Sequence, residues 1–485
     1  MSKIRRSLAY SFAGSYIALP LQLVGTMIIS RVLTPAETGV FAVAAVFAAI
    51  ASSFRDFGVG EYLIQEKDLS TEKIRAALTV NIATSWSMGL LLFVAAPYAA
   101  NFYDAPGVAH VMRIQALNFL LIPFGAVTMS YFRRELDFKP LFVASLLSNL
   151  TTFMVSTACA LQGLGYMSLA WSSLAGVVVS VGTSLLYRPA HFPSWPGLKG
   201  IRTVVQFGKF ASATYIFGQI GRGAPTMIIG RTQDMVGVAL FSRANGLVEL
   251  FNAVVMRSVA PVCLPYFAQS HREQGGLPRG YLLSISYITV IGWPFLAFMA
   301  TVAYAAVRLV YGSQWMASVP LAQILCLVGA VELVHSSAKE ALMAGGGVKQ
   351  SNTLQIIIQF TRITCVFAGV TFGLVGACWG LLGAAAVGAV ASQIILGRVV
   401  GLQCAAVFKA CLPSLLITLL SVAPSATWVF IVGIDESNYA WLSAAAGAVT
   451  VLAWLLAVRL LRHPLWTEVS KLAQKFMPKR EACPS

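Results

Sequence analysis

The chain has 485 residues, of which 58% are hydrophobic and only 11% are charged, and its formal net charge is +16. A water-soluble core of this length does not need so apolar a composition, so these numbers exclude an ordinary soluble protein and indicate a membrane protein. The positive charge would suggest nucleic-acid binding in a soluble protein. In a polytopic membrane protein its usual cause is retention of Lys and Arg on the cytoplasmic side, so we expect no nucleic-acid partner.

Fourteen apolar stretches are long enough to cross a bilayer, which takes about 20 mostly apolar residues. The predicted spans are 9–30, 39–56, 76–97, 109–131, 140–161, 166–187, 207–229, 237–260, 282–305, 319–341, 352–371, 374–396, 410–432 and 439–461. The basic start could belong to a signal peptide, but the apolar run continues past Ile29 without an obvious cleavage site, so we assign it to the first span. The connections are short, and we expect an all-α polytopic membrane protein without an independent extramembrane domain.

The basic residues predict the orientation of the spans. If the N-terminus is cytoplasmic, the outer loops hold only Arg31, Arg231 and Arg308, and the cytoplasmic segments hold most of the 34 Lys and Arg residues. The reverse orientation would place this excess on the outer side of nearly every loop. The positive-inside rule therefore predicts that both termini are cytoplasmic and that the number of spans is even.

The chain also contains an internal repeat. The segment 31–41, after the first span, aligns with 231–241, after the seventh, and Phe102-Tyr103-Asp104 aligns with Val310-Tyr311-Gly312. Six spans separate the members of each pair, so the two halves run in the same direction through the membrane, as in transporters with parallel repeats. The predicted division is an N-lobe (1–190, spans one to six), a cytoplasmic linker (191–206), a C-lobe (207–400, spans seven to twelve), spans thirteen and fourteen (401–465) and a basic cytoplasmic tail (466–485).

Polar residues recur on one face of several spans, at spacings of three and four residues that align them along a helix. The stripes are Ser212, Tyr215, Gln219, Arg222 and Thr226 on the seventh span, Ser242, Asn245, Glu249 and Asn252 on the eighth, and Asn352, Gln355, Gln359 and Arg362 on the eleventh. Through the repeat, Gln22 of the first span corresponds to Arg222. Hydrogen bonding between helices is the ordinary role of such Ser, Thr, Asn and Gln residues.

Arginine within a span needs a further explanation, because a charge at the bilayer centre costs roughly 2.5–3.5 kcal/mol on insertion scales and usually faces a partner or a hydrated cavity. Spans of the second half carry more positive charge than their glutamates can neutralise. We therefore predict a water-filled cationic cavity between the lobes, suited to phosphate, which guanidinium binds through paired hydrogen bonds. Its predicted substrate-binding residues are Arg222, Arg243, Arg362, Tyr215, Gln219, Asn245, Asn252, Gln359 and Gln22.

Three further predictions concern charged groups. Glu249 and Glu332 are candidates for ion coupling, and the alternative for each is that it neutralises an arginine. Arg55 and Asp56, at the cytoplasmic end of the second span, are predicted to form an end-of-helix pair, with a cytoplasmic gate or a contact between lobes as their functional role, and the alternative is a contact with substrate. We expect His335 to be an ordinary hydrogen-bonded interior histidine, and the alternative is that it carries a proton.

The eight cysteines include no Cys-x-x-Cys pair, and most lie within spans, so they are expected to be buried thiols, and neither a disulfide nor a metal site is predicted. No pair of carboxylates has a spacing suited to acid–base catalysis. We therefore expect a transporter that is not an enzyme and has no cofactor.

Several motifs resemble those of bacterial polysaccharide flippases of the Wzx type, in the polysaccharide transporter family of the multidrug/oligosaccharidyl-lipid/polysaccharide (MOP) exporter superfamily. They are Ser30-Arg31-Val-Leu-Thr-Pro35-Ala-Glu-Thr-Gly39-Val-Phe41, Asp56-Phe-Gly58-Val-Gly60 with Leu63-Ile64-Gln65, Ala100-Asn-Phe102-Tyr103 with Pro106, Ile229-Gly230-Arg231 and Phe241-Ser242-Arg243-Ala244. The resemblance covers roughly residues 5 to 400. The chain departs from the family pattern at Ala239, where the family usually has glycine.

The resemblance implies two six-helix lobes around a central cavity, a fold shared with multidrug (MATE) exporters and with flippases of peptidoglycan precursors. It implies flipping of undecaprenyl-pyrophosphate-linked oligosaccharide repeat units from the cytoplasmic to the periplasmic leaflet, for exopolysaccharide, capsule or O-antigen (lipopolysaccharide) synthesis. The implied mechanism is ion-coupled alternating access, with a proton or sodium gradient as the driving force. It further implies a place in the bacterial inner membrane and, as partners, a polysaccharide polymerase and a chain-length regulator.

Two alternatives stay open. A multidrug exporter of the same fold, a MATE-like antiporter, typically carries cationic cargo, for which an acidic cavity is expected in place of a basic one. A membrane-embedded polysaccharide polymerase or glycosyltransferase would use the same lipid-linked substrate, but it should present acidic residues or a sizeable loop on the outer face. The outer loops here are short, with only isolated acidic residues apart from Asp435-Glu436.

Overall fold

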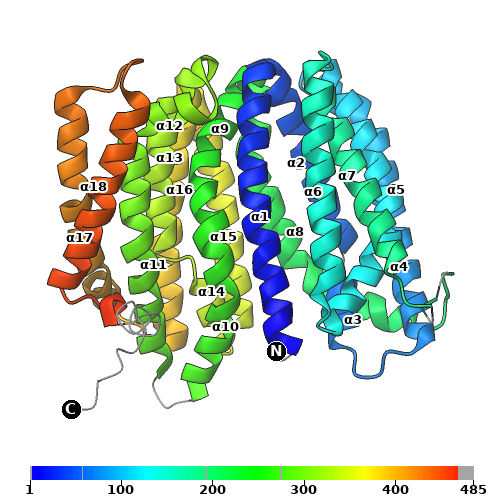
Figure 1. Ribbon diagram of the computed structural model, residues 1–485. Helices are drawn as coiled ribbons and strands as arrows, with labels where there is room; N and C mark the ends of the chain where they lie inside the picture. Colours follow the sequence, from blue (N-terminus) through cyan, green and yellow to red (C-terminus); the bar gives the residue numbers. More distant parts are fainter. Residues whose placement is uncertain (1–2, 57, 191, 194, 273–275, 468–485) are drawn as a thin grey trace, which may run out of the picture. The chain divides into compact units, whose positions relative to one another are not determined.

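The computed structural model describes residues 3–56, 58–190, 192–193, 195–272 and 276–467 (Figure 1). Every regular element in these ranges is a helix, and the described part of the chain contains no β-strand. Helices suit membrane-embedded segments because each satisfies its own backbone hydrogen bonds where no water is available. The predicted all-α class is confirmed. Most of the predicted basic tail, from residue 468 on, lies outside the described residues.

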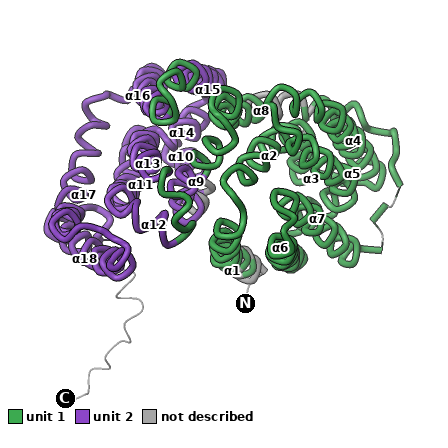
Figure 2. Tube along the Cα trace, turned by 90° about the horizontal axis from the view of Figure 1, so that it is seen from above, with its two compact units in different colours: residues 1–242, 310–317, 366–377 green, residues 243–309, 318–365, 378–485 purple. Residues whose placement is uncertain are grey.

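The chain divides into two compact units, which Figure 2 shows in different colours. Unit 1 comprises residues 1–242, 310–317 and 366–377, and unit 2 comprises residues 243–309, 318–365 and 378–485. The lobes predicted above follow the sequence repeat, whereas these units follow from which residues lie close together in space. The predicted lobe boundaries therefore stay a prediction.

Eight helices lie wholly in unit 1. They are α1 (Lys3–Val32), α2 (Pro35–Asp56), α3 (Val59–Gln65), α4 (Thr71–Phe102), α5 (Pro106–Arg134), α6 (Phe138–Leu161), α7 (Met167–Leu186) and α8 (Ile201–Thr232). Within this unit α4 packs along α5, and α6 packs between α7 and α1 (Figure 1). Helices α2 and α3 both contact α4, α5 and α8.

The remaining helices belong wholly or largely to unit 2. They are α9 (Met235–Phe251), α10 (Arg257–Arg272), α11 (Gly276–Thr301), α12 (Ala303–Val310), α13 (Val319–Leu333), α14 (Ala338–Ala344), α15 (Val348–Gly369), α16 (Gly373–Val400), α17 (Cys404–Val432) and α18 (Tyr439–Leu460). A π-helical turn, Asn252–Met256, joins α9 to α10, and 3₁₀ turns at Ser313–Ser318 and Val370–Phe372 precede α13 and α16. Helix α11 packs against α13 and α17, and α17 packs against α18.

Eleven helical stretches of the described residues are long and apolar enough to cross a membrane. One of them, Val348–Val400, contains both α15 and α16. Helix α1 contributes a shorter apolar stretch, Tyr16–Val32, and α8 is not among the eleven although it is 32 residues long. The chain is therefore a multi-pass membrane protein, and the number of fourteen spans stays a prediction.

The repeat is visible in the helix boundaries. Helix α1 ends and α2 begins at positions that match the end of α8 and the beginning of α9 at an offset of 200 residues. In the first turn the Glu37 carboxylate accepts hydrogen bonds from the Thr34 N–H (2.9 Å) and hydroxyl (2.8 Å), which is a capping box. In the second turn Asp234, at the position equivalent to Thr34, accepts from the Gly237 N–H. Local capping therefore ends one helix and begins the next at equivalent positions in the two halves of the repeat.

These two turns contact each other within unit 1. A Cβ added to Gly39 would lie 1.8 Å from the carbonyl oxygen of Met235, so the two backbones touch where only glycine leaves room. The carbonyl oxygen of Ser30, just before the first turn, accepts hydrogen bonds from the buried Trp315 indole (Nε1–O, 2.8 Å) and from Gln314. The 3₁₀ turn from the second half is thereby held at the end of α1.

Each turn also contacts the later loop of the other half. Arg231, from the second half, pairs with Asp104 from the first (Nη1–Oδ2, 3.3 Å) and lies over the Phe102 ring at 5.2 Å. Arg31, the first-half equivalent of Arg231, packs against Gly312, the equivalent of Asp104: a Cβ on Gly312 would be 3.5 Å from the Arg31 Cγ. We call these turns, at 30–41, 102–106, 231–237 and 310–315, the crossed-turn cluster.

The substitution Gly39→Ala tests the close approach in this cluster. The added methyl group would collide with the Met235 backbone, which cannot move aside as a flexible side chain can. We expect a loss of at least about 1–3 kcal/mol in stability, the usual cost of overpacking, measured as a lower melting temperature of the purified protein. Gly383→Ala is the matched control, because a Cβ at Gly383 meets nothing within 4 Å. Equal melting temperatures for the two variants would contradict the proposed contact.

Candidate functional site

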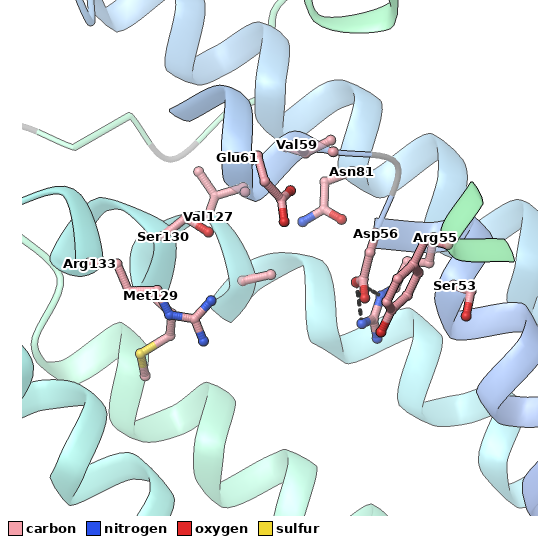
Figure 3. A pocket seen from close by; sticks show the side chains of 14 residues that line it. Ser53, Arg55, Asp56, Val59, Glu61, Asn81, Val127, Met129, Ser130 and Arg133 are labelled. Carbon is pink, nitrogen blue, oxygen red and sulfur yellow. Dashed lines mark hydrogen bonds and ion pairs between the residues drawn. The ribbon is translucent and has the colours of Figure 1, made fainter. Parts of the chain in front are cut away.

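Unit 1 contains a polar cavity of about 520 Å³ at the end of the helices opposite to the crossed-turn cluster (Figure 3). Helices α2 and α5 both begin at the cluster and end at the cavity, and a helix the length of α2 spans about 33 Å. The cavity is lined by Ser53, Arg55, Asp56, Gly58, Val59, Gly60, Glu61, Asn81, Ala126, Val127, Met129, Ser130, Arg133 and Tyr215. These residues come from α2, α3, α4, α5 and α8 and from the turn between α2 and α3.

The cavity contains two guanidinium groups and two carboxylates. Arg55 and Asp56 pair at the end of α2, with Nε 2.9 Å from Oδ1, and their side chains are 14% and 54% exposed. Arg133 and Glu61 line the other side, on α5 and α3 (Figure 3). Because Arg55 is much more buried than Asp56, the pair presents its carboxylate to solvent and keeps its guanidinium against the helices.

Two glycines shape the wall of the cavity between α2 and α3. Gly58 has φ +64°, a left-handed conformation, and directly precedes α3. At Gly60 a Cβ would be 3.2 Å from the Ser130 hydroxyl, so α3 lies close against α5. With α3 placed in this way, Glu61 lines the same cavity as Arg55 (Figure 3).

Arg134 holds α3 in this position. Its Nη1 donates to the Leu63 carbonyl (2.9 Å) and to that of Glu66, and its Nη2 donates to the Lys67 carbonyl (3.0 Å). These are carbonyls of the last turn of α3 and of the residues after it, which no further helical turn satisfies. Lys73 then pairs with Glu66 (Nζ–Oε1, 2.9 Å), and this hydrogen bond holds the pKa of the Glu66 carboxyl below its usual value.

The cavity can bind a ligand rich in hydroxyl groups. Asn81, 5% exposed, and Ser130, 7% exposed, provide buried polar groups beside the charged ones. Carboxylates accept hydrogen bonds from hydroxyls, guanidinium groups donate them, and an amide does both. With two positive and two negative groups, the lining is balanced in charge. A sugar fits this lining, and a phosphate could bind if one guanidinium turned toward it.

The predicted site residues of unit 1 fall in different places. Arg55, Asp56 and Tyr215 line the cavity. On α8, Arg222 is exposed and donates to Gln219 one turn before it (Nη2–Oε1, 2.7 Å). The repeat-related Gln22 is exposed on α1.

The predicted residues of unit 2 lie on α9, the π turn, α13 and α15. Arg243 and Asn245 are half-buried on α9, Glu249 is exposed near its end, and Asn252 begins the π-helical turn. On α15, Arg362 forms an ion pair with Glu332 of α13, and the buried Gln359 has an amide oxygen without a hydrogen-bond partner among the described residues. The cationic wall predicted to join Arg222 with Arg243 and Arg362 stays a prediction.

Sequence reasoning missed Glu61, Asn81 and Arg133. Glu61 and Arg133 stand at span ends, where charges are common, and Asn81 stands near the beginning of a span, so a search for polar stripes in mid-span passes over all three. The available signal was the pair Gly58 and Gly60 directly after a charged pair, because two glycines so close together mark a sharp turn of the backbone.

The helices and the polar groups between them define a class, the multi-pass all-helical membrane proteins with a polar interior. Solved structures share the fold. A lipid II flippase MurJ in an inward closed conformation aligns with TM-score 0.74 over 94% of this chain and 99% of that one, at 13% identity. An inward-facing multidrug resistance MATE family transporter of the MOP superfamily aligns with TM-score 0.61 over 78% and 94%, at 15% identity. The expected fold is confirmed.

Residues 28–320 match the family described as "Polysaccharide biosynthesis protein", and the chain belongs to this family. It is 23% identical to the teichuronic acid biosynthesis protein TuaB of Bacillus subtilis (strain 168) over 90% of this chain and 92% of that protein. It is 23% identical to the lipopolysaccharide biosynthesis protein WzxC of Escherichia coli (strain K12), over 77% and 76%. It is 26% identical to the succinoglycan biosynthesis transport protein ExoT of Rhizobium meliloti (strain 1021), over 67% and 66%. The predicted resemblance is confirmed.

Two neighbouring arginines are predicted to have separable roles. Arg134→Ala removes the donor that satisfies the end of α3, so we expect a loss of about 1.5–3 kcal/mol, the range for hydrogen bonds to a charged group. Arg133→Ala removes an exposed side chain that lines the cavity, and the melting temperature should stay that of the wild type. Thermal unfolding of both purified variants checks this, and a stable Arg134→Ala protein would show that α3 does not depend on that side chain.

Proposed function

We propose that the protein flips undecaprenyl-pyrophosphate-linked oligosaccharide repeat units from the cytoplasmic to the periplasmic leaflet of the bacterial inner membrane. The observation that carries this proposal is the cavity of about 520 Å³ with charged, amide and hydroxyl groups inside a bundle of membrane-length helices. The polar headgroup of a lipid-linked glycan needs such a lining, whereas its polyprenyl tail can stay in the bilayer. The product would feed exopolysaccharide, capsule or O-antigen synthesis.

The position of the cavity along the helices supports a transport cycle. The cavity lies where α2 and α5 end, on the side that the positive-inside rule assigns to the cytoplasm. At the other end of the same helices the crossed-turn cluster is closed by backbone contact and by the pair of Arg231 with Asp104. Such an arrangement suits loading from the cytoplasm, and in our proposal the cluster opens during ion-coupled alternating access.

The relatives support the class of cargo. TuaB, WzxC and ExoT are named for teichuronic acid, lipopolysaccharide and succinoglycan, three different polymers. What such polymers have in common is assembly from sugars, so we assign a lipid-linked glycan as the substrate class. We also propose that a polymerase and a chain-length regulator act with the protein, and that the protein itself is not an enzyme.

Export of cationic drugs is the second candidate, because a MATE transporter shares the fold. A lipophilic cation would need an apolar pocket with unpaired carboxylates. In the cavity described above, Asp56 is already paired with Arg55, and the second carboxylate, Glu61, shares the lining with the guanidinium of Arg133. This lining favours the glycan.

Substitutions in the cavity test the proposed function. We expect Glu61→Ala and Arg133→Ala to lower the flipping rate about 10- to 100-fold, since a hydrogen bond to a charged group contributes about 1.5–3 kcal/mol. The rate is measured as surface polysaccharide formed in a deletion strain that carries each variant, at equal protein levels. Arg202→Ala is the control, because Arg202 is exposed on α8 and does not line the cavity. Normal polymer from both cavity variants would count against the cavity as the substrate site.

The predicted cationic residues have a separate test. Arg222→Ala removes the guanidinium that pairs with Gln219, and we expect it to block surface polysaccharide while the protein stays folded, because the pyrophosphate would lose a bidentate donor. Undiminished polymer at a normal protein level would remove Arg222 from the binding site and would leave the flippase proposal intact.

A further inference from the structure

The tenth predicted span is interrupted inside unit 2. Helix α13 ends at Leu333 and α14 begins at Ala338, and the residues between them form turns. There the N–H of His335 donates to the Glu332 carbonyl (3.2 Å), three residues back where an α-helix reaches four. Neither proline nor glycine stands in this segment, so the interruption comes from polar side chains that compete with the backbone for hydrogen bonds, as the Ser336 hydroxyl does at the Leu333 carbonyl (3.0 Å).

Two buried polar atoms of this break have no hydrogen-bond partner within the described ranges: the Nε2 of His335 and the hydroxyl of Ser337. A buried polar group without a partner destabilises the folded protein. Within the described residues, the expected hydrogen-bond partner of the His335 ring is therefore missing at Nε2. Such an atom in a native protein needs an explanation, and a bound water, a bound ion or a functional role is the usual one.

The ring is enclosed by the neighbouring helices. A Cβ on Gly388 of α16 would lie 2.9 Å from His335 Nε2 and 3.4 Å from a side-chain carbon of Ile358 on α15. Glycine at this position is what leaves the imidazole its space. Val334 and Ile358 pack against a buried apolar cluster that includes Ala338 of α14. The polar atoms of the break are thus surrounded by mostly apolar side chains.

One ion pair lies beside the ring. Glu332, at the end of α13, pairs with Arg362 of α15, and the two side chains are 38% and 18% exposed. These are the charged groups that act on the His335 ring, and from α16 the neighbour is the uncharged Gly388. Further along, Glu340 of α14 is instead within electrostatic reach of Cys263 of α10 and Tyr281 of α11. Glu340 is therefore not counted among the charged groups around His335.

We propose that the break between α13 and α14 is a proton-binding site that couples the proton gradient to transport, an inference that rests on the proposed function. His335 Nε2 takes one proton from water and later returns it to water, so the only bond that forms and breaks is N–H. The imidazolium then competes with Arg362 for the Glu332 carboxylate. Protonation therefore loosens the contact of α13 with α15, and the interruption lets α14 shift against α13.

Proton binding can be measured without transport. The chain has five histidines, so a protein labelled with ¹⁵N in the histidine rings and held in lipid nanodiscs gives few signals, and His335→Gln identifies the one of interest. We expect that signal to shift as the ring takes up a proton, with a midpoint inside the pH range over which the protein stays folded. That midpoint should change in the Glu332→Gln, Arg362→Gln double variant, which removes both charges together. A His335 signal that stays constant over this whole range would overturn the proposal.

Coupling is measured in proteoliposomes with a fluorescently labelled undecaprenyl-pyrophosphate-linked monosaccharide. With one proton per cycle, a gradient of one pH unit should support about tenfold accumulation of the lipid in one leaflet, because one unit corresponds to about 1.4 kcal/mol. His335→Gln should equilibrate the lipid without accumulating it. His271→Gln, the same change at an exposed histidine of α10 outside the break, should accumulate it like the wild type.

The outcomes separate the two proposals. Accumulation by His335→Gln equal to that of the wild type would overturn the coupling role even if the ring titrates. A wild-type protein that moves no labelled lipid, with or without the gradient, while His335 titrates, would count against the proposed function and would support the proton site at the break.

Discussion

A charged or polar group inside a membrane-spanning bundle must find a partner or water, and the arrangement of this protein follows from that constraint. Where partners exist, they hold helices together, as Glu332 and Arg362 do between α13 and α15. Where several polar groups converge without filling the space between them, a cavity remains, as it does around Arg55, Glu61 and Arg133. Structure and function are therefore set by the same few side chains, because lipid makes each unpaired charge costly.

The two ends of unit 1 are built in different ways. At one end, the backbone at Gly39 contacts the backbone of Met235, and Arg231 from the second half of the repeat forms an ion pair with Asp104 from the first half. At the other end, two glycines and the donor groups of Arg134 bend the chain away from the helices and leave a space. Helices α2 and α5 thus run from a closely packed end to an end with a cavity. The proposed transport cycle requires such a difference, because the site opens to one side at a time.

How much could be predicted depends on the range of the interaction. The turns at Thr34 and Asp234 could be read from the sequence, since a capping residue acts on atoms only a few positions away. The cavity could be read only in part: Arg55 and Asp56 were found, but Glu61 and Arg133 stand 72 residues apart and meet only because α3 packs on α5. The missing partner of His335 Nε2 among the described residues could not be read from the sequence, because whether a side chain finds a partner depends on neighbours such as Gly388 that are distant in the chain.

The amino-acid sequence alone determined that this is a helical multi-pass membrane protein, that it contains a duplication and that it is a polysaccharide-type transporter, because composition, period and motif are local properties of the chain. It also predicted the orientation, which depends on the distribution of Lys and Arg. The tertiary structure decided which charges are paired, where a cavity opens and where a span breaks. Those features arise where helices pack side by side, and the choice of neighbours is made by the whole fold.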